Sequence, residues 1–325
     1  MKRFLSLLAF CAICCTSAFG QEVSVIGRFD YPVYPYLYTL VEGDLGEHFS
    51  YSISNHWVSD DTRALYRNTW RADDFNWCDW ANISFNTGSW SFTLGKDIIA
   101  VGSFEIDEYD WDSYWEVNTS FWNNAQVYQW GGKAAYTLPS ESSTFTVQLT
   151  SSPFNYRPFD NKLLSYAFQW SGDYGLYRSL WSVNLMQYGR GKGESIRLLA
   201  SGNQFDVTDW LTLGLDYIMG DYDAATSHTF TGSANFSISD HFGLLLKGGY
   251  EASGRPKGSD EIEDWYGMFG IPYARTYAGA VIQYYPLADS QDLRIHALAC
   301  YDSFNGPQFS GGITYNFNLT NLFTR

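Results

Sequence analysis

The sequence has little positive charge, few cysteines and only one long apolar run. Its 20 Lys and Arg face 35 Asp and Glu, which gives a formal net charge of −15. Nucleic acids are bound by a basic face, so this excess of acids argues against a nucleic-acid partner. Charged residues make up only 17% of the 325 residues and aromatic residues 19%, so the chain can bury enough apolar surface to fold, and intrinsic disorder is excluded.

The apolar run lies at the N-terminus and is too short to cross a membrane. Lys2 and Arg3 precede it, the run covers residues 4–15, and a small-x-small sequence ends at Gly20. This order is typical of a cleaved secretory signal peptide. We therefore expect residues 1–20 to be a signal peptide and residues 21–325 to form one domain. Three of the five cysteines leave with the signal, so a disulfide framework is excluded.

Alternation of apolar and polar residues recurs along the rest of the chain. In residues 211–219, Leu211, Leu213 and Leu215 share one face, and Thr212 and Asp216 lie on the other. Such a period of two predicts half-exposed β-strands. Sixteen segments between residues 22 and 319 fit this pattern. A chain that crosses a membrane without apolar helices must do so as a closed barrel, but a water-soluble sandwich also alternates.

The connections between these segments favour the barrel. Short links such as 44–46, 87–89 and 239–241 alternate with longer ones at 59–75, 98–124, 151–161, 220–227 and 251–275. Short turns at one rim, long loops at the other and strands of about ten residues are typical of outer-membrane proteins. The sequence therefore predicts an all-β transmembrane antiparallel β-barrel of about 16 strands, with short periplasmic turns and long extracellular loops. Cys78 and Cys300 then lie on strands too far apart to be bridged, and we expect two free thiols.

The chain from residue 21 resembles a Gram-negative outer-membrane porin, of the general or the phosphate-selective porin O/P kind. The last segment keeps its apolar parity through Phe309, Ile313 and Phe317 to Phe323, similar to the terminal signal of such proteins, although Arg325 ends the chain. The resemblance implies a third loop folded into the barrel, an outer-membrane location, a homotrimer and passive diffusion of small hydrophilic solutes. It implies neither catalysis nor a cofactor.

The long link over residues 98–124, which corresponds to the third loop implied by the resemblance, is rich in acids and aromatic residues and has no Lys or Arg. Inside the barrel its carboxylates would form an acidic pore constriction, and its rings would either stack on solutes or pack the loop onto the wall. The candidate constriction residues are Glu105, Asp107, Glu108, Asp110, Asp112 and Glu116. The candidate stacking residues are Trp111, Tyr114 and Trp115.

Strand parity predicts an opposing inner wall with basic side chains, namely Arg28, Lys133, Arg197, Lys247 and Arg294. An acidic loop opposite such a wall would set up a transverse field across the water-filled gap. Together with the acidic balance of the chain, this predicts a preference for cations or for neutral solutes such as sugars. Phosphate is less expected, because a phosphate pathway requires more basic residues.

Metal-binding and catalytic motifs are missing from the sequence. Glu108, Asp110 and Asp112 alternate as in a calcium loop, but Ser113 stands at the required Gly and Thr119 at the required Glu. G-x-S-x-G, H-E-x-x-H and P-loop motifs are absent. We therefore expect no metal, no cofactor and no enzyme. Two alternatives stay open: a secreted or surface carbohydrate-binding β-protein, and an outer-membrane barrel enzyme that uses acid pairs in its loops.

Overall fold

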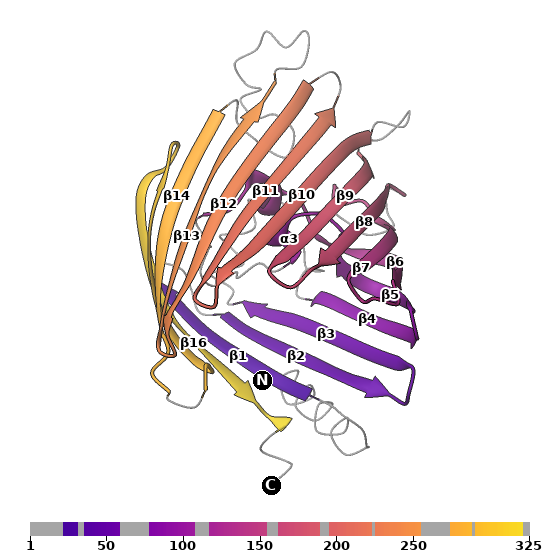
Figure 1. The fold of residues 1–325 in the computed structure, drawn as a ribbon, viewed down its shortest axis with the longest axis horizontal. Helices are drawn as coiled ribbons and strands as arrows, with labels where there is room; N and C mark the ends of the chain where they lie inside the picture. Colours follow the sequence, from indigo (N-terminus) through magenta and orange to yellow (C-terminus); the bar gives the residue numbers. More distant parts are fainter. Residues whose placement is uncertain are drawn as a thin grey trace.

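The strands form one sheet that closes on itself (Figure 1). The computed structural model describes residues 22–31, 36–58, 78–107, 117–154, 162–188, 195–222, 225–254, 274–287 and 290–320. The expected signal peptide lies outside the described residues. Each strand pairs antiparallel with the next in the chain, and β16 pairs with β1, with Arg28 opposite Thr314. The predicted fold class is therefore confirmed.

The barrel has sixteen strands, as the sequence predicted. In chain order they are β1 (Glu22–Tyr31), β2 (Tyr36–Leu45), β3 (Phe49–Val58), β4 (Cys78–Thr87), β5 (Trp90–Ile98), β6 (Tyr128–Thr137), β7 (Ser143–Ser151), β8 (Leu164–Asp173), β9 (Tyr177–Gln187), β10 (Ser195–Thr208), β11 (Leu211–Tyr222), β12 (Ala225–Ser239), β13 (Phe242–Ser253), β14 (Ala274–Tyr284), β15 (Leu293–Asp302) and β16 (Gly306–Asn318).

One expected long link is wrong. The sequence indicated a loop over residues 220–227, but β11 continues to Tyr222 and β12 begins at Ala225. The polar residues there extend the hydrogen-bonded ladder, with Met219 opposite His228 and Asp221 opposite Thr226. Polar composition suggested a loop, but cross-strand pairing satisfies these backbone groups just as well.

Two short helices, α3 (Phe104–Asp107) and α4 (Ser120–Asn124), lie between β5 and β6. Thr119 caps α4, and its side chain accepts a hydrogen bond from the backbone N–H of Trp122. No helix in the described residues is long and apolar enough to cross a membrane.

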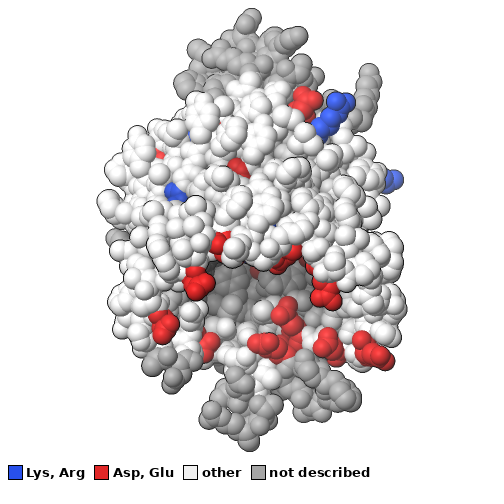
Figure 2. Space-filling model, viewed as in Figure 1, with Lys and Arg blue, Asp and Glu red and all other residues white. Residues whose placement is uncertain are grey.

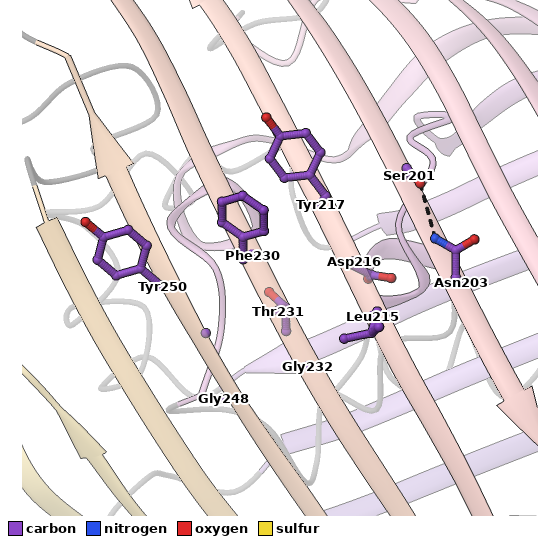
Figure 3. Close-up of a pocket in the computed structure, with 11 residues that line it drawn as sticks. Ser201, Asn203, Leu215, Asp216, Tyr217, Phe230, Thr231, Gly232, Gly248 and Tyr250 are labelled. Carbon is purple, nitrogen blue, oxygen red and sulfur yellow. Dashed lines mark hydrogen bonds between the residues drawn. The ribbon is translucent and has the colours of Figure 1, made fainter. Parts of the chain in front are cut away.

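The outer face of the barrel is apolar and the inner face is largely polar. Leu94 is 66% exposed and Phe309 73% exposed, both pointing outward. Figure 3 shows a part of the outer wall where the paired Phe230 and Tyr250 lie on one side of the paired Gly232 and Gly248. Because glycine has no side chain, a hollow of about 430 Å³ lies here. An apolar exterior around a polar interior is the reverse of a water-soluble sandwich, whose apolar side chains point inward.

Cys78 and Cys300 are free thiols, as predicted. They lie on β4 and β15, which are five positions apart around the closed ring.

Gly95 offers a test of the barrel wall. Its φ of +134° lies in a region that L residues rarely adopt, and an added Cβ would overlap the carbonyl oxygen of Ala81. We expect Gly95→Ala to lower the free energy of unfolding by about 2 kcal/mol, measured by urea unfolding in lipid vesicles. The matched control is Gly27→Ala, where an added Cβ meets nothing within 4 Å, and which should change stability by less than about 0.5 kcal/mol. Equal effects of the two changes would show that the backbone at Gly95 does not require glycine.

Candidate functional site

The segment between β5 and β6 lies inside the barrel, where α3 is visible within the ring of strands (Figure 1). Its backbone is hydrogen-bonded to inward-facing side chains of the wall. The N–H of Ala100 donates to Gln148 Oε1 on β7 at 2.7 Å, and the N–H of Gly102 donates to Ser182 Oγ on β9 at 2.8 Å. Asn184 Nδ2 donates to the carbonyl oxygen of Ala100 at 2.7 Å. The inward-folded third loop that the resemblance implied is therefore present.

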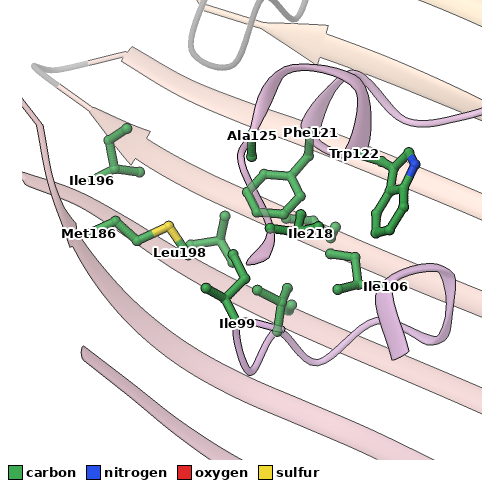
Figure 4. Close-up of a cluster of buried hydrophobic side chains, with 12 residues drawn as sticks. Ile99, Ile106, Phe121, Trp122, Ala125, Met186, Ile196, Leu198 and Ile218 are labelled. Carbon is green, nitrogen blue, oxygen red and sulfur yellow. The ribbon is translucent and has the colours of Figure 1, made fainter. Parts of the chain in front are cut away.

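Apolar packing holds this loop against one side of the wall (Figure 4). Ile99, Ile106 and Phe121 of the loop contact a cluster that includes Met186 and Leu198 of β9 and β10, and all five side chains are almost fully buried. Burial of each such side chain stabilises the fold by roughly 1.5–3 kcal/mol. The inner wall is thus dry where the loop covers it, because these inward positions carry apolar residues in place of polar ones.

A buried ion pair joins the loop to β13. Lys247 Nζ lies 2.5 Å from Glu105 Oε1, and the two side chains are only 5% and 2% exposed. Glu105 also accepts hydrogen bonds from the backbone N–H and the hydroxyl of Thr119. One carboxylate therefore ties together the first and second halves of the loop and the barrel wall.

A second buried network clamps the loop from β13, β14 and β15. Arg275 bridges Glu251 and Asp302, with nitrogen–oxygen distances of 2.8 and 2.6 Å. Its Nη1 also donates to the carbonyl oxygen of Asn118 at 2.8 Å. Glu251 accepts hydrogen bonds from both the backbone N–H and the hydroxyl of Ser120, each at 2.8 Å.

A third carboxylate, Asp216 on β11, holds the start of α3. It accepts hydrogen bonds from the Ser103 hydroxyl at 2.6 Å and from the backbone N–H of Glu105 at 3.0 Å. The three attachments fix the loop on both sides of residues 108–116.

The structure describes only part of the predicted constriction. Glu105 is buried and paired with Lys247, while Asp107, at the end of α3, is exposed. The other predicted acids, Glu108, Asp110, Asp112 and Glu116, lie outside the described residues. The same holds for the candidate stacking residues, Trp111, Tyr114 and Trp115.

Four of the five predicted wall residues point inward. Arg28 alternates with the outward Phe29, and Arg294 alternates with the outward Ile295. Lys133 forms an ion pair with Asp97 at 2.5 Å, and Lys247 pairs with Glu105 as described above. The basic wall and the loop segment therefore meet in direct contact at Lys247.

The expected inward position of Arg197 is wrong. Its neighbours Ile196 and Leu198 contact the loop inside the barrel, so Arg197 lies on the outer face. Its side chain is 78% exposed, and Nη1 lies 3.9 Å from Asp221 Oδ2. Both faces of β10 carry apolar residues here, so the alternation did not reveal which face is outward.

Sequence reasoning missed Arg275, Glu251 and Asp302. Arg275 and Asp302 fell just outside the expected strands, which ran over residues 276–285 and 293–301, so their parity was not considered.

Among the described residues, no group of three or more His, Cys, Asp or Glu side chains could hold a metal ion.

The Glu105–Lys247 pair gives a test of the loop attachment. Lys247→Met should lower the free energy of unfolding by about 3–5 kcal/mol, because it leaves the charge of Glu105 buried without a partner. The double variant Glu105→Gln/Lys247→Met should recover most of this loss in urea unfolding. The control is Arg197→Met, which removes an exposed pair and should cost less than about 1 kcal/mol. A double variant no more stable than Lys247→Met would show that the loss is not caused by leaving the Glu105 charge without a partner.

No protein-family model and no curated protein sequence matches the chain, but solved structures do. The outer membrane channel DcaP of Acinetobacter baumannii superposes with a TM-score of 0.63 at 12% identity, over 92% of this chain and 96% of that one. Salmonella typhi OmpF, solved in complex with daunomycin, gives 0.65 at 10% identity, over 94% and 99%. A mutant of the Rh. blastica porin gives 0.54 at 10% identity, over 92% and 100%. At such identities the likeness concerns the fold alone. The chain therefore has the fold of the outer-membrane porins, the family that its sequence resembles.

Proposed function

We propose that this chain is a passive diffusion channel for small hydrophilic solutes in the outer membrane of a Gram-negative bacterium. The observation that carries the proposal is a closed sixteen-stranded barrel with an apolar exterior, a polar interior and a loop packed inside it. Barrels of this strand number are wide enough to enclose water, and a loop attached to the inner wall narrows that space. The surrounding lipid and, as the resemblance implies, two further copies of the chain are the proposed partners.

The position of the loop supports an open pathway beside it. Its described contacts run along the inner faces of β7 to β15. The inner faces of β3 and β4 carry polar side chains, such as Ser50, Ser52, Asn82 and Ser84. Solutes would pass between this polar wall and the loop.

Acidic residues at one end of the barrel support a preference for cations. Figure 2 shows a hollow bordered by acidic residues. The short links between strands carry Glu47, Glu141, Asp209, Asp240 and Asp292, and their described residues include no Lys or Arg. A mouth lined by one sign of charge concentrates counter-ions. Neutral solutes such as sugars meet no such field and would pass by size.

The acidic residues of the loop have different roles in the proposed channel. Glu105 is already compensated by Lys247. We propose that Asp107, Glu108, Asp110, Asp112 and Glu116 contribute negative charge to the constriction. Arg28 and Arg294, which point inward from β1 and β15, belong to the opposing wall.

A water-soluble carbohydrate-binding protein is the weaker candidate. Its apolar side chains would fill a dry centre, whereas Leu94, Leu215 and Phe309 point outward here. We assign no catalytic role to any residue.

Planar-bilayer recordings test the channel and its charge preference together. The wild type should conduct, and its reversal potential in a KCl gradient should indicate cation preference. The triple variant Glu47→Gln/Asp209→Asn/Asp240→Asn should lower the ratio of cation to anion permeability, because it removes three charges from one mouth.

The control is Asp221→Asn, which removes an acid from the outer face next to Arg197 and should leave the ratio unchanged. Absence of any conductance would refute the channel itself. Conductance with an unaltered ratio in the triple variant would refute the role of the mouth acids.

A further inference from the structure

Trp80 is an aromatic residue on the inner wall, on the opposite side of the strand from the outward Ile83. It lies near the start of β4 and is half-buried. Its indole Nε1 donates a hydrogen bond to Ser52 Oγ on β3 at 2.6 Å. The ring also packs near Tyr128, with centroids 5.8 Å apart and planes tilted by 38°. The indole is thus held in place on the wall, although most inward residues around it are small and polar.

The same serine connects Trp80 to a carboxylate. Ser52 Oγ donates to Glu42 Oε1 at 2.6 Å while it accepts from the indole. A hydroxyl that accepts from one neighbour and donates to another orients both side chains. The indole and the Glu42 carboxylate are therefore fixed next to each other on the inner face of β2, β3 and β4.

A second carboxylate faces the first across the ladder. Glu22 on β1 is directly opposite Glu42 on β2. Glu22 accepts a hydrogen bond from Asn318 Nδ2 at 2.9 Å, which does not neutralise it. Within the described part of the chain, no Lys or Arg pairs with Glu22 or Glu42. Like charges directly opposite each other destabilise a sheet, so an external cation would be favourable at this position.

We propose that Trp80, Ser52, Glu42 and Glu22 form a binding subsite for small organic cations on the inner wall. This inference rests on the proposed channel function and names a solute class for it. The ammonium group of the solute would lie at the carboxylates, and its alkyl groups would contact the indole. Coulomb attraction to the carboxylates and a cation–π interaction with the ring act together only on such a solute. A hydrated inorganic cation gains little from the ring, and a neutral sugar lacks the positive charge that the two carboxylates attract.

Block of the potassium current by tetraethylammonium tests the subsite. We expect tetraethylammonium to reduce the wild-type single-channel current in a saturable manner. Trp80→Leu should raise the half-blocking concentration about threefold, the usual size of a partly exposed cation–π contact. Glu42→Gln should raise it by a similar or larger factor. Ser52→Ala keeps both binding groups but removes their connection, and should give an intermediate increase.

The controls separate this site from general effects. Trp90→Leu removes an aromatic ring from the outer face, where Trp90 is 47% exposed. Glu47→Gln removes one charge of the same sign from the turn between β2 and β3. Trp90→Leu should leave the half-blocking concentration unchanged. Glu47→Gln should raise it less than Glu42→Gln does, because it only weakens the field at the mouth. Unheated electrophoresis of each variant should show a folded barrel.

Three results would overturn the subsite while leaving the channel intact. These are conduction without saturable block, a Trp80→Leu effect no larger than that of Trp90→Leu, and a Glu42→Gln effect equal to that of Glu47→Gln. The last would indicate a diffuse field in place of a site. Block by glucose at the same concentration would show that the ring selects neutral sugars instead. A protein that never conducts would refute the proposed function itself.

Discussion

The closed hydrogen-bonded ladder is the constraint on which the rest of the molecule depends. Pairing of β1 with β16 leaves no strand edge, so every strand has two partners. Closure is what allows an apolar surface to face lipid, because unpaired backbone groups cannot be hydrated there. It also creates an interior large enough to hold a loop. The inward and outward roles of each side chain follow from this one arrangement.

Inside the barrel, apolar contacts and buried ion pairs together hold the loop against the wall. Apolar contacts around Phe121 and Leu198 exclude water from part of the wall. The exclusion of water lets Glu105–Lys247 and Glu251–Arg275–Asp302 act as strong, direction-specific attachments, since buried charges must be paired. The compensated charges cannot also supply a field to the lumen. This is why we propose that acids elsewhere, at the mouth and on the inner wall near Trp80, act electrostatically on solutes.

Much of the architecture was predictable because β-strand side chains alternate with a fixed period. Outward residues such as Leu213 and Leu215 could be recognised from this period alone, and so could the inward Arg28 and Lys247. The period failed at β10, where Ile196 and Leu198 pack on the loop while Leu199 faces outward. It also gave no information at Arg275 and Asp302, which lie at strand ends, where the boundaries are least predictable.

The sequence by itself determined the strand number, the alternating faces and the presence of a long acidic third loop, because each of these is a local property of composition and period. Only the tertiary structure decided which charges meet. Lys247 and Glu105 are 142 residues apart in the chain, and Ser52 connects Glu42 to Trp80 across three strands. Such contacts depend on strand register and on the path of the loop through the barrel, and neither is encoded in any local pattern.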